Sequence, residues 1–156
     1  MPTAAQRMAQ AGIVLPDVVA PVAAYVPAVR VGSLVMTSGQ LPMRDGVLAA
    51  TGIVGDGPGY LSAEDAVPLA RLCALNAVAA AADAAGGLDR LARVVKVVGF
   101  VAAEPSFAGH PSVINGASDL FHQIFGDAGV HARSAVGVAS LPLGAPVEVE
   151  AIFELA

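Results

Sequence analysis

Apolar and acidic residues alternate along the C-terminal end of the chain, and this pattern constrains the fold more than any other stretch. Four apolar residues and three carboxylates share it: Val147, Val149, Ala151 and Phe153, against Glu148, Glu150 and Glu154. Successive side chains of a β-strand point to opposite faces, so residues 147–155 are predicted to form a strand with one core-facing side. The acidic side is then either a solvated surface or part of a site.

The rest of the sequence predicts further strands and two helices. Segments rich in valine or shaped like a hairpin indicate strands at 25–30, 34–38, 91–101 and 133–138. A turn at 30–33 joins the first two strands as a hairpin. One helix is indicated by Pro111 near its start and Gly126 just past its end.

The other helix has two possible starting points. Ser62 followed three residues later by Asp65 resembles a capping box, which would place Pro68 inside the helix. Asp65 as the N-cap would instead place Pro68 in the tolerated first turn. Gly86–Gly87 ends the helix in either case, and its apolar residues lie nearly all around it, so it should be buried by more than one neighbour.

This order of elements predicts one α+β domain over residues 1–156, with a mixed sheet and two helices packed on one face. Residues 1–20 form an irregular or loosely helical lead-in. The glycine-rich residues 51–60 read as a surface loop, because no phosphate-binding fingerprint lies between a strand and a helix there.

The composition limits the classes of partner. Charged residues make up only 13% of the chain and hydrophobic residues 56%, which favours a large interface in a symmetric homo-oligomer. A net charge of −5 with eight scattered Lys and Arg makes nucleic acid an improbable partner. Polar residues interrupt the apolar stretches, the N-terminus lacks the pattern of an export signal, and Cys73 is the single cysteine. We therefore expect a cytoplasmic protein without a membrane segment.

Several chemically active residue types have simple structural interpretations. His110, His122 and His131 form no metal-binding motif, so surface positions and no metal site are expected. Cys73 falls within the apolar helix pattern and is expected in the core. Tyr25 can be an ordinary strand aromatic. Asn115 is either a surface residue or a helix residue kept for its amide group.

Arg133 is the strongest candidate for a binding residue. It is the only Lys or Arg after Lys96, and its planar guanidinium can hold a carboxylate through two parallel hydrogen bonds. An internal ion pair with the acidic residues of 147–155 is the structural alternative. If strands 133–138 and 147–155 formed one tight hairpin, however, Glu148 would lie roughly 16 Å away along the ladder. The two residues therefore meet only if these strands are not hairpin partners or come from different subunits.

Two stretches are similar to the signatures of the RidA family, also called YjgF/YER057c/UK114 and endoribonuclease L-PSP. They are ARSAVGVASLPLGAPVEVEAI and TSGQLP, supported by Tyr25 in AAYVPAV and Asn115 in VINGASDLF. The resemblance covers residues 20–154 and suggests a longer-loop subgroup. It implies a chorismate-mutase-like α+β fold and a homotrimer with clefts between subunits.

The resemblance also implies a function without cofactors: hydrolysis of reactive 2-enamino or 2-imino acids to 2-keto acid and ammonia. The residues that match the family's site are Arg133, which grips the substrate carboxylate, Glu148, which handles water, and the cleft residues Tyr25, Ser38, Gly39, Asn115 and Ala135. A non-catalytic trimer that binds small keto acids is the main alternative, and an endoribonuclease is the third.

Two departures from the family pattern affect this expectation. Ala135 replaces the cysteine that often follows the Arg-Ser pair, so a thiol-linked role is in doubt. His131–Ala132 replaces a preceding proline, which can reshape the entrance and alter substrate choice. Neither change removes the arginine or the glutamate that the chemistry needs.

Overall fold

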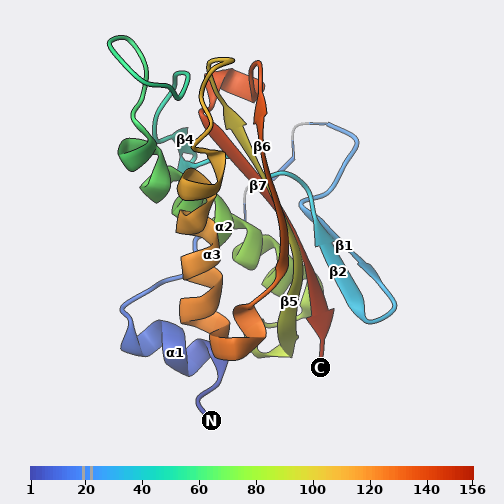
Figure 1. Cartoon of the computed structure of the whole chain (residues 1–156). Helices are drawn as coiled ribbons and strands as arrows, with labels where there is room; N and C mark the ends of the chain where they lie inside the picture. The colour runs from blue at the N-terminus through green and yellow to red at the C-terminus, as the bar shows by residue number, and fades with distance from the viewer. Residues whose placement is uncertain (19, 22) are drawn as a thin grey trace.

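A five-stranded mixed sheet covered on one face by two long helices forms the body of the molecule in the computed structural model, which describes residues 1–18, 20–21 and 23–156 (Figure 1). The large sheet has the order β1-β2-β7-β5-β6. Its strands are β1 (Ala28–Val31), β2 (Leu34–Thr37), β5 (Leu91–Ala102), β6 (Ala132–Val138) and β7 (Val147–Leu155). A separate two-stranded sheet pairs β3 (Met43–Arg44) with β4 (Val47–Leu48). The predicted α+β class is confirmed.

Three α-helices complete the fold. They are α1 (Ala4–Gln10), α2 (Ala63–Ala85) and α3 (His110–Phe125), with short 3-10 turns at Leu88–Arg90, Gly126–Gly129 and Pro142–Gly144. The lead-in predicted at 1–20 thus contains a short helix, capped by Thr3, and residue 19 of that range lies outside the described residues. In Figure 1, α2 and α3 lie on the same side of the sheet, and the β1–β2 hairpin extends beyond them.

Helix α2 begins at the first of the two predicted caps. The Ser62 side chain accepts a hydrogen bond from the Asp65 backbone N–H, and Pro68 therefore lies inside the helix. Gly86 ends the helix in the left-handed conformation, at φ 81°. By length and composition α2 could span a membrane, but 67% of its most apolar window is buried, as expected for the core helix of a small soluble domain.

The strand pattern at the C-terminus gives β7 two different faces. Its odd-numbered residues are buried beneath the helices, whereas Glu148, Glu150 and Glu154 point to the face that no helix covers. β7 is the middle strand of the sheet, so its acidic side chains are spread along the open face. The predicted strand over 147–155 is confirmed residue for residue.

Two details differ from the prediction. The strand predicted at 25–30 begins only at Ala28, so Tyr25 lies in the preceding loop with 54% of its surface exposed. The β-propensity of Tyr25 and Val26 does not suffice, because the pairing of β1 with β2 begins only at Ala28 and no other described strand pairs with these two residues. The glycine-rich loop is mainly exposed, but it buries Val54, which bridges to Leu61 and Ala103.

Helices α2 and α3 approach each other closely at Gly116. A Cβ atom at this position would overlap the carbonyl oxygen of Val67 in α2. Gly116 lies between Asn115 and Ser118, so the close approach also sets where these two polar side chains stand above the sheet.

We predict that Gly116→Ala destabilises the fold. Gly→Ala in a helix usually stabilises by about 1 kcal/mol, but the overlap with Val67 should lower the free energy of unfolding by about 2 kcal/mol. Urea denaturation at one fixed protein concentration measures this, with the exposed Ser112→Ala as the control in the same helix. A variant as stable as the wild type would contradict the close contact.

Candidate functional site

Arg133 stands on the edge strand β6 and reaches toward α3. Its Nη1 donates hydrogen bonds to Oδ1 of Asn115 at 2.8 Å and to Oγ of Ser118 at 3.2 Å. Asn115 and Ser118 are three residues apart and therefore share one face of α3. The predicted pair of Arg133 and Asn115 is thus close in the structure, and Ser118 is a partner that sequence reasoning missed.

The hydrogen bonds to α3 leave one edge of the Arg133 guanidinium, formed by Nε and Nη2, available to a ligand. Arginine carries five N–H donors, and the two on Nη1 are used by the neutral oxygens of Asn115 and Ser118. Within the described residues, no hydrogen bond is made by Nε or Nη2 of Arg133, and no carboxylate pairs with the guanidinium. Nε and Nη2 form a planar two-donor fork, which matches the two oxygens of a carboxylate.

Glu148 lies in a second group of predicted residues. A Cβ atom at Gly39 would overlap the Glu148 carboxylate, so the glycine makes room for this side chain. Gln40 and Val149 exchange two backbone hydrogen bonds of 2.8 and 3.0 Å, which hold the segment after β2 against β7. The acidic side chain therefore has one defined place beside the Gly39 backbone.

Ser38 and Tyr25 border the same group. The Ser38 hydroxyl donates to the Val26 carbonyl at 2.7 Å, and its backbone N–H donates to the Pro27 carbonyl at 2.8 Å. These bonds hold the loop that carries Tyr25 next to the end of β2. Tyr25, Ser38, Gly39 and Glu148 thus lie together on the β2–β7 side of the sheet.

Burial and a neighbouring charge both act on Glu148. Burial raises the pKa of the half-buried Glu148 carboxyl above its ordinary value, and the nearby Glu150 raises it further. Burial also raises the pKa of the Cys73 thiol, which lies in the core as predicted and contacts the Val147 carbonyl. A carboxyl group whose pKa is raised can exchange protons closer to neutral pH.

Within this chain, Arg133 and Glu148 are well separated. β5 lies between β6 and β7, so the two strands are not hairpin partners. Arg133 is level with Val97 of β5 and Glu148 with Phe100, which means that they point to opposite faces. Two strand spacings and three residue steps put their Cα atoms roughly 14 Å apart. Ala135 shares the helix-side face of Arg133, two residues further along β6.

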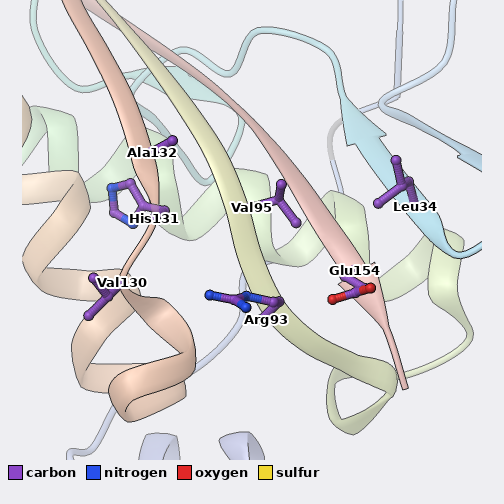
Figure 2. Close-up of a pocket in the computed structure, with 7 residues that line it drawn as sticks. All are labelled: Leu34, Arg93, Val95, Val130, His131, Ala132 and Glu154. Atoms are coloured by element: carbon purple, nitrogen blue, oxygen red, sulfur yellow. The ribbon is translucent and has the colours of Figure 1, made fainter.

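A shallow hollow lies on the open face of the sheet, and neither Arg133 nor Glu148 lines it. Its volume is about 340 Å³, and it is lined by Leu34, Arg93, Val95, Val130, His131, Ala132 and Glu154 (Figure 2). In Figure 2 the Arg93 side chain extends toward the segment that carries Val130 and His131. In the part of the chain that the structure describes, no group of three or more His, Cys, Asp or Glu is placed to hold a metal ion.

His131 is a second partner that the sequence did not reveal as such. Its Nε2 is 3.0 Å from Oγ of Ser118, and its Nδ1 is 2.6 Å from the Gly129 carbonyl oxygen. Burial lowers the pKa of His131 below 6.5. The Gly129 hydrogen bond partly opposes this shift, and the charge of Arg133 adds a smaller decrease. The i to i+3 spacing of Asn115 and Ser118 was the available signal for this polar face of α3.

The mixed sheet, the two helices on one face and the arginine at the edge strand define the chorismate-mutase-like class of small α+β proteins. The family model described as "YjgF/chorismate mutase-like, putative endoribonuclease" matches residues 5–155. This chain belongs to that family.

Known relatives agree with this assignment over nearly the whole chain. Protein TCP17 of Trypanosoma cruzi is 45% identical over 152 residues, covering 97% of this chain and 93% of TCP17. The crystal structure of a protein described as a putative endoribonuclease from Shewanella oneidensis is 35% identical. Its TM-score is 0.91, and the match covers 99% of this chain and 100% of that one. Escherichia coli TdcF with bound serine is 26% identical with a TM-score of 0.64, covering 89% and 94%.

We predict that Glu150→Gln lowers the pKa of Glu148 but does not return it to the ordinary value of about 4.3. The variant removes the like charge, whereas burial, the larger cause, remains. A carboxyl ¹³C NMR titration measures the shift. Glu154→Gln is the control, because it removes a charge from the same face six residues away; an unchanged Glu148 in the Glu150 variant would contradict the proposed coupling.

Proposed function

We propose that this protein hydrolyses reactive 2-imino and 2-enamino acids to 2-keto acids and ammonia, in clefts between the subunits of a homotrimer. The observation that carries the proposal is the free Nε–Nη2 fork of Arg133, whose other terminal nitrogen is held by two neutral oxygens. A cation that has no counter-charge among the described residues of its own chain favours an anionic ligand. TdcF, whose crystal structure holds serine, is a relative with a carboxylate-bearing ligand.

A cleft between subunits would bring the two groups of residues together. Arg133 and Glu148 point to opposite faces of one sheet and cannot both reach a three-carbon substrate within one chain. A neighbouring subunit would supply the Glu148 group, with Tyr25, Ser38 and Gly39, opposite the Arg133 group. The uncovered sheet face supports such packing, because it carries exposed apolar side chains such as Val29, Val31 and Val136.

The chemistry needs only these side chains and water. Arg133 would hold the carboxylate and thereby place the adjacent C=N carbon. Glu148 would take a proton from water as the C–O bond forms and deliver a proton to nitrogen, giving a carbinolamine. Glu148 then takes the hydroxyl proton and passes it to the amine nitrogen as the C=O bond forms and the C–N bond breaks, so that ammonia leaves and Glu148 is again a carboxylate. The raised pKa of Glu148 suits both directions of proton transfer.

Two alternatives remain from the family. A trimer that binds keto acids without turnover would use the same arginine fork. The family description names an endoribonuclease, but an acidic chain with a net charge of −5 has little to attract RNA. RNA cleavage by nuclease-free protein that Arg133→Ala abolishes would favour this third function over the deaminase.

We predict that Arg133→Ala lowers kcat/KM for imino acid hydrolysis about 100-fold. Loss of a charge-assisted bidentate contact costs about 3 kcal/mol, which equals that factor. The assay follows ammonia release from 2-iminopropanoate generated in place by an amino acid oxidase. Arg44→Ala, an exposed arginine in β3, is the matched control. Wild-type protein that does not exceed the buffer rate would overturn the deaminase proposal.

The Glu148→Gln variant distinguishes the proposed hydrolase from a protein that binds keto acids without turnover. We predict at least a 100-fold loss of kcat with pyruvate binding reduced less than threefold, because the amide keeps the shape but cannot transfer the proton. Isothermal titration calorimetry measures the binding. Equal turnover in the variant and the wild type would remove the role assigned to Glu148.

A further inference from the structure

A chain of hydrogen bonds connects the candidate binding arginine to a histidine outside the predicted site. Arg133 Nη1 donates to Ser118 Oγ at 3.2 Å, Ser118 Oγ is 3.0 Å from His131 Nε2, and His131 Nδ1 is 2.6 Å from the Gly129 carbonyl oxygen. Phe121 packs its ring edge-on against the imidazole, with centroids 5.6 Å apart and an interplanar angle of 83°. The imidazole plane is therefore fixed from two sides.

The direction of each hydrogen bond in this chain follows from its two ends. A carbonyl oxygen can only accept, so the proton of the neutral His131 ring must be on Nδ1. Nε2 then has a lone pair and accepts the Ser118 hydroxyl proton. With that proton turned toward His131, the Ser118 oxygen offers its lone pair to Arg133.

We propose that His131 is a positioning residue for the substrate carboxylate: through Ser118 it holds Nη1 of Arg133 and so directs the Nε–Nη2 edge toward the ligand. This proposal rests on the proposed carboxylate-binding role of Arg133. Asn115 holds the second Nη1 hydrogen, so the two contacts together fix the guanidinium plane. The histidine needs no contact with the substrate to act in this way.

Protonation of His131 would weaken the hold of Ser118 on Nη1 of Arg133. With a proton on Nε2, the imidazolium would donate to Ser118, whose oxygen would then face two cationic donors at once. The charged groups facing the imidazole are Arg133 of β6, two residues after His131, and Arg93 of β5 and Glu154 of β7, which line the same hollow as His131 (Figure 2). From α3, Ser118 and Phe121 are uncharged. Partial burial of the ring also opposes protonation near neutral pH.

The test is pyruvate binding by wild-type protein, His131→Gln and Ser118→Ala, measured by calorimetry between pH 5 and 8. At pH 7.5 we expect both variants to bind three- to tenfold more weakly. Wild-type affinity should also fall in acid, at a pH lower than the ordinary imidazole value of about 6.5, because burial lowers the pKa of His131. That acid limb should be absent in His131→Gln and present in Glu148→Gln. His122→Gln is the control, since His122 is exposed and its Nδ1 is hydrogen-bonded to the Gly126 carbonyl.

Two results would overturn the proposal: unchanged pyruvate affinity in both variants, or an acid limb that persists in His131→Gln. If wild-type protein binds no 2-oxo acid at all, the proposed function fails. The positioning role of His131 is then tested by NMR on the ligand-free protein. ¹⁵N NMR should then show His131 with its proton on Nδ1 and slow rotation about the Cζ–Nε bond of Arg133, lost in Ser118→Ala. An Nε2-protonated neutral ring, or unchanged rotation, would overturn the inference independently.

Discussion

The proposed function depends above all on the two hydrogen bonds between Nη1 of Arg133 and helix α3. Asn115 and Ser118 accept both hydrogens of Nη1 with neutral oxygens, so the guanidinium is fixed while no carboxylate among the residues that the structure describes compensates its charge. An internal carboxylate would have turned the same arginine into a structural ion pair. Arg133 is therefore available to bind a ligand because its hydrogen-bond partners are neutral.

The sheet topology explains why the proposed site is incomplete within a single chain. Placing β5 between β6 and β7 separates Arg133 from Glu148, and the alternation of side chains sends them to opposite faces. Glu148 stands in a place made by the missing side chain of Gly39, next to an open apolar sheet face. Both half-sites are therefore built locally, and assembly is what the proposed chemistry requires.

Local signals predicted much of the fold. The alternation over 147–155 and the glycines after α2 and α3 act within a few residues, so they could be read directly, whereas Ser62 was only one of two possible caps. Strand order could not be predicted this way, because both a hairpin and a separated arrangement fit the same segments. Tyr25 was misplaced because pairing, not propensity, decides where β1 begins.

The candidate site was predictable only in part. Arg133, Asn115, Glu148 and Gly39 came from residue chemistry and family resemblance, whereas Ser118 and His131 become partners only when α3 packs on β6. The most direct measurement is a crystal structure of the assembled protein with pyruvate bound. We predict that the pyruvate carboxylate lies on Nε and Nη2 of Arg133, with Glu148 of another subunit beside the keto carbon. Arg133 paired with an internal carboxylate, or a closed surface at that edge, would contradict it.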